Sequence, residues 1–137
     1  MKITILLAAL LLSACAQVVP YVAKPGISNP SSVIEQALME QKEDRRPEFV
    51  RVTGEYVEFG KNTTGEINGF TGKTSVHRNV TRLYWRSVHT STVYTKRANV
   101  IIQFRSAQGS LLAQVVTDDV TKGEQLIDAV ETMKINE

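Results

Sequence analysis

The only thiol in this chain of 137 residues is that of Cys15. With no second cysteine, it has no partner for an intramolecular disulfide, so its chemistry is expected to be that of a single modified thiol. It follows Lys2, an apolar run over residues 3–12, and the small residues Ser13 and Ala14. The run is shorter than the ~20 apolar residues that span a bilayer, and this order is typical of a cleaved export signal. The pattern predicts a signal peptide over residues 1–14.

The four residues from Leu12 to Cys15 resemble the lipobox of bacterial lipoproteins. The resemblance implies a diacylglyceryl group on the Cys15 thiol, cleavage before that residue, and an acyl chain such as palmitate on the new amine. Two or more acyl chains anchor a protein stably in a bilayer. Ala16, in place of Asp, implies the outer membrane of a Gram-negative host, with the domain facing the periplasm. The alternative is an ordinary secretory signal in which Cys15 plays no part.

A second set of candidate residues lies at alternate positions of one expected strand. Arg78, Arg82 and Arg86 would project from one face of a strand over residues 78–86, with Val80 and Tyr84 between them. Guanidinium groups bind phosphate and carboxylate groups, so the three arginines and Tyr84 could bind an anionic lipid, lipopolysaccharide or glycan. The alternative is that the arginines lie at the rim of the sheet, where their aliphatic stems cover Tyr84.

The distribution of charge gives some support to an anionic ligand. The formal net charge is only +2, but no acidic residue lies between Glu66 and Asp118. That stretch holds seven basic residues, which are Lys73, Arg78, Arg82, Arg86, Lys96, Arg97 and Arg105. A basic segment of this kind is consistent with an anionic partner. The alternative is that these side chains face solvent on a sheet and are balanced in space by acidic helices.

The remaining motifs do not favour catalysis or metal binding. The Gly-Lys-Thr at residues 72–74 is similar to part of a phosphate-binding loop, but Ile67 occupies the position of its first glycine. His77 and His89 have no cysteine or carboxylate near them in sequence, and Asp118 and Asp119 precede a helix that they can cap. We therefore expect no enzyme, no metal and no cofactor.

Residue patterns predict the elements that would position these side chains. Residues 16–29 show no periodicity and are expected to be a lipidated tether with Cys15, able to reach about 45 Å if extended. A helix should follow, capped by Asn29 or by Ser32 with Glu35, and Pro47 lies beyond its end. Strand patterns cover residues 49–53, 56–59, 80–88 and 93–95, and residues 60–75 are expected to be a long loop or flexible hairpin.

The C-terminal part of the chain has the clearest periodicity. Residues 99–105 and 111–117 are expected to pair as a hairpin and to be the most buried strands, because both carry apolar residues on both faces. Thr121 and Glu124 match a capping box before a final amphipathic helix. This order predicts one α+β domain over residues 30–137, with an antiparallel curved sheet or partial barrel, an N-terminal helix and a C-terminal capping helix.

The chain from residue 83 onward resembles the pleckstrin-homology-like (PH-like) domains of bacterial proteins. The resemblance rests on the Leu-Tyr-Trp at residues 83–85, the apolar hairpin and the final helix. It implies a bent seven-stranded barrel closed by that helix, with residues 52–59 as a first strand. It implies no particular activity, because such folds host lipid, peptide and protein binders.

Together these features favour a non-catalytic, membrane-anchored envelope lipoprotein that binds or helps to assemble another envelope protein. The alternative function is binding of an anionic envelope ligand, such as a phospholipid, lipopolysaccharide or glycan, through the basic β segment. In both cases the bilayer is a partner through acylated Cys15, and no nucleic-acid partner is expected.

Overall fold

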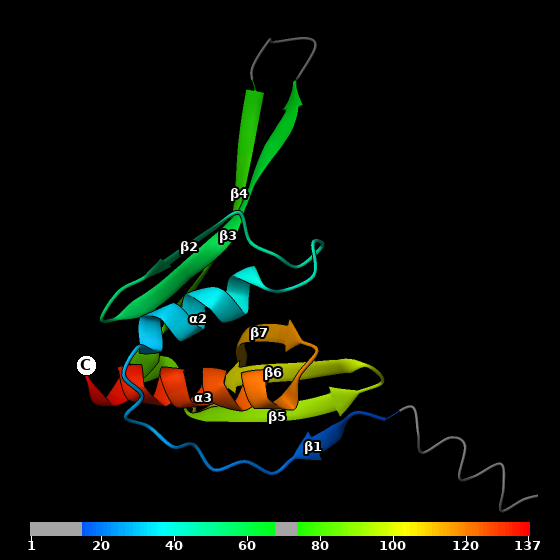
Figure 1. The fold of residues 1–137 in the computed structure, drawn as a ribbon. Helices are drawn as coiled ribbons and strands as arrows, with labels where there is room; N and C mark the ends of the chain where they lie inside the picture. Colours follow the sequence, from blue (N-terminus) through cyan, green and yellow to red (C-terminus); the bar gives the residue numbers. More distant parts are fainter. Residues whose placement is uncertain (1–14, 68–73) are drawn as a thin grey trace, which may run out of the picture.

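The described residues form an α+β domain in which two helices pack with two antiparallel sheets (Figure 1). The computed structural model describes residues 15–67 and 74–137, and the side chains of residues 62–78 lie outside that description. The elements are β1 (Gln17–Val19), α2 (Pro30–Met39), β2 (Phe49–Val52), β3 (Tyr56–Ile67), β4 (Thr74–Tyr84), β5 (Thr90–Lys96), β6 (Asn99–Arg105), β7 (Leu111–Thr117) and α3 (Val120–Ile135). The α+β class predicted from the sequence is confirmed.

The strands are divided between two sheets that do not close into a barrel. Sheet A has the order β1-β5-β6-β7, and sheet B has the order β2-β3-β4. The chain passes from sheet B to sheet A through a 3-10 turn at Trp85–Ser87. The β3–β4 hairpin extends well beyond the rest of the molecule, at the end opposite β1 (Figure 1).

One core lies between the helices and the two sheets. Val100, Ile102 and Phe104 alternate along β6 and point toward α3, as period-2 alternation requires. Trp85 is fully buried, and its indole N–H donates to the backbone oxygen of Thr53 at 3.0 Å. This bond satisfies the polar atom of the largest core side chain at the junction between the two sheets.

The predicted tether is wrong for most of its length, because residues 17–27 dock along the domain. β1 pairs antiparallel with β5, from Gln17 opposite Thr95 to Val19 opposite Val93. Side chains farther along pack against the core, namely Val19, Tyr21, Ala23 and Ile27. The backbone N–H groups of this segment find acceptors on α3, where Asp128 accepts from Lys24 at 2.7 Å. These partners lie about a hundred residues away in sequence, so local periodicity could not reveal them.

Of the two alternatives predicted for residues 60–75, the hairpin is confirmed and the long loop is wrong. β3 continues to Ile67 and pairs antiparallel with β4, which begins at Thr74, and residues 68–73 lie outside the description. Gly60 permits the close pairing of the two strands, because a Cβ atom there would lie 2.1 Å from the backbone oxygen of Asn79.

Of the predicted caps, Asn29 and Asp119 are confirmed, whereas the capping boxes at Ser32 and Thr121 are wrong by three and two residues. Asn29 is the N-cap of α2, without a side-chain hydrogen bond, and Ser32 lies inside the helix. Asp119 caps α3 and accepts a hydrogen bond from the Thr121 backbone N–H at 2.7 Å. A carboxylate at the N-cap also interacts favourably with the helix dipole, which explains why Asp119 takes this position ahead of Thr121.

Candidate functional site

The three arginines of the predicted anion site do not form one group. β4 ends at Tyr84, so the alternation expected over residues 78–86 is interrupted by the 3-10 turn. Arg86 lies in that turn, and its Nε donates to Glu137 Oε1 at 2.9 Å, close to the C-terminus of α3. Arg78 is paired with Asn62 in the β3–β4 ladder, and its side chain lies outside the description.

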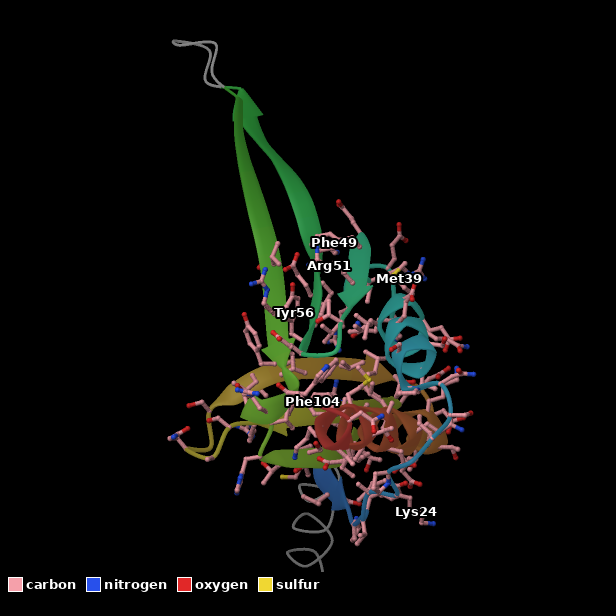
Figure 2. The ribbon with its side chains drawn as sticks, turned by 90° about the vertical axis from the view of Figure 1, so that its left-hand side faces the viewer. Lys24, Met39, Phe49, Arg51, Tyr56 and Phe104 are labelled. Carbon is pink, nitrogen blue, oxygen red and sulfur yellow. The ribbon has the colours of Figure 1, made fainter. Side chains whose placement is uncertain are left out.

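Arg82 and Tyr84, by contrast, lie together on the outer face of sheet B. The register places Tyr56 opposite Tyr84, Glu58 opposite Arg82, and Arg51 opposite Glu58. The residues between them face inward, since Val57 and Leu83 are buried in the core. We call Arg51, Tyr56, Glu58, Arg82 and Tyr84 the Arg–Tyr cluster. Figure 2 shows Arg51 and Tyr56 on this sheet, far from Lys24 at the other end of the molecule.

The two tyrosines and two arginines of the cluster are in direct contact. The rings of Tyr56 and Tyr84 are tilted, with centroids 5.3 Å apart. The Arg82 guanidinium carbon lies 4.6 Å from the centroid of the Tyr56 ring, and that of Arg51 lies 5.9 Å from it. Arg51 also donates to the Tyr56 hydroxyl at 2.8 Å. Both distances are within cation–π range, so the arginines hold the Tyr56 ring from two directions.

The charges of the cluster are unequally compensated. Arg82 Nε donates to Glu58 Oε2 at 2.9 Å, and its Nη2 bonds the same oxygen. The pKa of Arg82 is raised, first by its hydrogen bond with the Tyr84 hydroxyl and then by the Glu58 carboxylate. Among the described residues Arg51 forms no ion pair, so it is the cation of this face that is available to a ligand.

The cluster combines features that occur in protein–protein contacts. Tyr84 is 39% exposed, and the side chain of Arg82 is 47% exposed. Exposed, mutually ordered Tyr and Arg side chains lose little conformational freedom on binding and recur at the centres of protein interfaces. The arrangement can offer ring faces to an apolar group and one guanidinium to an acceptor.

Three members of the cluster were not identified from the sequence. Arg51, Tyr56 and Glu58 alternate with core residues in β2 and β3, which is a signal for an outward-facing set. Sequence patterns do not give the strand partners, however, and only the register brings these residues beside Arg82 and Tyr84.

The other candidates whose side chains are described do not assemble into a site. Among those side chains, no three from His, Cys, Asp or Glu are grouped so that they could hold a metal ion. His89 is exposed before β5, the side chain of His77 lies outside the description, and Asp118 pairs with Lys122 at 3.7 Å. Most of the Gly-Lys-Thr motif lies at residues 68–73, outside the description.

The cavities found in the described part of the chain are small. One of about 180 Å³ lies beside Gly26 and Thr132, and another of about 110 Å³ lies between α2 and α3. Apolar core residues enclose about 10 Å³ near Trp85 and Phe104. Sites for small molecules usually have roughly 300 Å³ or more. These volumes favour a surface contact over an enclosed ligand.

Cys15 is exposed, and only Ala16 separates it from β1. No described helix combines the length and the apolar character needed to cross a bilayer.

The sequence matches no protein-family model, and comparison with curated proteins and with solved structures finds no significant relative.

Proposed function

We propose that this chain is a bacterial envelope lipoprotein, anchored through acylated Cys15, whose domain is a non-catalytic module that binds another envelope protein. The anchor rests on the lipobox-like residues 12–15 and on the single thiol. If the host has an outer membrane, Ala16 favours that membrane and a domain facing the periplasm. We also propose kinship with PH-like domains, which the two antiparallel sheets and the C-terminal helix support.

The observation that supports binding of a protein is the Arg–Tyr cluster on the outer face of sheet B. Tyr56 and Tyr84 form a ring pair, and the Arg51 guanidinium beside it bonds the Tyr56 hydroxyl but forms no ion pair in the described chain. A partner with an apolar side chain over the rings and a carboxylate or backbone carbonyl near Arg51 would complement this face. β4 is also an edge strand of sheet B, so the backbone N–H and C=O groups along its outer edge, next to the Arg–Tyr cluster, are available for pairing with a partner strand.

The alternative, an anionic ligand bound by Arg78, Arg82 and Arg86, has less support. Glu58 compensates the charge of Arg82, and Glu137 compensates that of Arg86. These two arginines also differ in setting, since one lies on a sheet face and the other in a 3-10 turn. A common phosphate or carboxylate ligand would have to displace both glutamates.

Photocrosslinking in intact cells tests the proposal. A photoreactive amino acid would replace Val80, which is exposed on the same face as Tyr84, or Ala107, which is exposed in the β6–β7 turn of sheet A. We expect a discrete crosslinked product from position 80 only, and its loss when Arg51→Ala and Tyr84→Ala are added. Equal products from both positions, or a product that persists in the double variant, would contradict the proposal.

A further inference from the structure

The position of β1 fixes where an anchor on Cys15 would enter the bilayer. β1 is antiparallel to β5, with Gln17 opposite Thr95. If this register were extended by two residues, Cys15 would face Arg97, in the turn that joins β5 to β6. Because Ala16 is the only residue between Cys15 and β1, the Cα of Cys15 cannot be farther than about 7 Å from that of Gln17 at the end of sheet A. The domain is therefore held against the membrane by this end.

The turn beside Cys15 is basic. Lys96 and Arg97 are both exposed, and neither forms an ion pair with a carboxylate in the described chain. Arg97 has a φ angle of 58°, in the left-handed region that favours glycine or asparagine. The tip of the turn thus carries two free cations, one of them at a backbone position that does not favour arginine.

An apolar row crosses the outer face of sheet A at the same end. The register aligns Val18, Tyr94 and Ile101 on the face opposite the buried Val93 and Ile102. Val18 is 59% exposed, and Tyr94 and Ile101 are half-buried. The solvent side of an antiparallel sheet is usually polar. As predicted, β6 and β7 hold more of the buried core residues than the other described strands, although in the described chain neither helix covers this side of β6.

We propose that Val18, Tyr94, Lys96, Arg97 and Ile101, here called the basal patch, form a second membrane contact that binds anionic phospholipids beside the anchor. This rests on the proposed acylation of Cys15. Lys96 and Arg97 bind lipid phosphates, and the apolar row lies at headgroup depth, where tyrosine is favoured. The anchor prevents escape, and the patch fixes the orientation of the domain. The β3–β4 hairpin lies at the end opposite β1, so it is held away from the bilayer (Figure 1).

The basal patch is chosen over a protein contact because of where the anchor emerges. Insertion of the acyl chains brings the surface next to the acylated cysteine to the lipid headgroups. That surface therefore contacts lipid and is not available to a protein partner. Two basic residues near an anionic leaflet contribute about fivefold each to the contact equilibrium, or roughly 30-fold together. A single turn with two cations is therefore sufficient to orient an anchored domain.

Spin labelling of the acylated full chain tests the proposal. A nitroxide on Ala98→Cys reports on the β5–β6 turn, and one on Ala107→Cys reports on the opposite end of sheet A. Each protein is reconstituted in phosphatidylcholine vesicles with or without an equal amount of phosphatidylglycerol. We expect the Ala98→Cys label in anionic vesicles to be protected from a water-soluble nickel chelate and accessible to oxygen, and the Ala107→Cys label to stay exposed to the chelate.

Two charge variants make the test specific. Lys96→Gln with Arg97→Asn removes both cations and suits the positive φ angle, and should decrease the contact equilibrium about 30-fold. Arg86→Gln with Lys134→Gln removes the same charge near the C-terminus of α3, and should leave the protection unchanged. Equal exposure of the two labels in anionic vesicles, or equal effects of the two charge variants, would overturn the basal patch.

The labelling itself separates failure of the anchor from failure of the patch. Acylated Cys15 has no free thiol, so each introduced cysteine should bind one nitroxide per chain. Two nitroxides per chain would show a free Cys15 and overturn the anchor. The difference between the charge variants on anionic vesicles would still decide the patch.

Discussion

Replacing Asp128 with alanine should release the N-terminal segment and convert it into a flexible tether. Asp128 lies in the middle of α3 and accepts from the Tyr21 hydroxyl at 2.7 Å and from the Lys24 backbone N–H at 2.7 Å. Gly26 is held separately, because its N–H donates to Thr132 Oγ1 at 2.9 Å. Asp128 is thus the acceptor for the part of the segment nearest to β1.

The size of the effect follows from these two bonds. A hydrogen bond to an ionised group contributes about 1.5–3 kcal/mol, and the low end applies here because the site is partly exposed. Loss of both bonds should lower the free energy of opening of residues 17–24 by about 3 kcal/mol, or roughly 150-fold in the opening equilibrium. Tyr21→Phe removes only the hydroxyl donor and should cost about 1.5 kcal/mol, or roughly tenfold.

Hydrogen exchange of the full chain in detergent micelles measures this opening directly. Peptides covering β1 and Tyr21 should exchange faster in the Asp128→Ala variant, with an intermediate rate in Tyr21→Phe. Glu124→Ala, one turn earlier on α3, is the matched control because Glu124 forms no hydrogen bond with residues 15–29 in the structure. Unchanged exchange in Asp128→Ala, or equal acceleration in Glu124→Ala, would refute the assignment of docking to Asp128.

Three further changes probe the same architecture. Burial and then the bond to Asp128 raise the pKa of Tyr21 from 10.0 to about 12. The contribution of Tyr21 to the docking energy should therefore be full below pH 10 and be lost as the pH rises to 12. A tyrosinate absorbance titration should show this high-pH step in the wild type and not in Tyr21→Phe. Gly60→Ala should lower the free energy of unfolding by about 3 kcal/mol in denaturant titrations because its Cβ would clash with the β4 backbone, whereas Gly54→Ala, with no atom within 4 Å, should change it by less than about 0.5 kcal/mol. Gln41→Leu should cost about 2 kcal/mol in the same assay because the buried Gln41 amide accepts from a β7 backbone N–H at 3.1 Å, and the exposed Gln36→Leu is its control.

Local patterns sufficed for the elements whose partners are adjacent in sequence. The β6–β7 hairpin has the predicted bounds, and α3 buries the apolar stripe that includes Leu126, Ile127 and Val130. In both cases the periodicity is set by the element itself, and the turn or cap lies within a few residues. The start of α2 was likewise predicted from a local pattern, since Pro30 lies in its first turn.

Patterns failed where the stabilising contact is distant. Residues 17–27 show no periodicity, yet they dock along the domain because β1 pairs with β5 and Asp128 accepts from the Lys24 backbone N–H. Arg86 lies outside the predicted arginine row because β4 ends at Tyr84, and Trp85, whose indole bonds to the distant Thr53, begins a 3-10 turn. Neither event leaves a signal in a window of ten residues.

What the sequence determined by itself is chemistry at single positions: one thiol after an apolar run, a basic segment from residue 67 to 117, and alternating inward and outward residues in the strands. What only the tertiary structure decided is which of these meet. Strand register brings Tyr56 beside Tyr84, pairs Arg82 with Glu58, and sets Gln17, two residues after Cys15, opposite Thr95. The physical reason is that antiparallel pairing and docking onto α3 are long-range contacts, whose energies depend on the complete core and not on neighbouring residues.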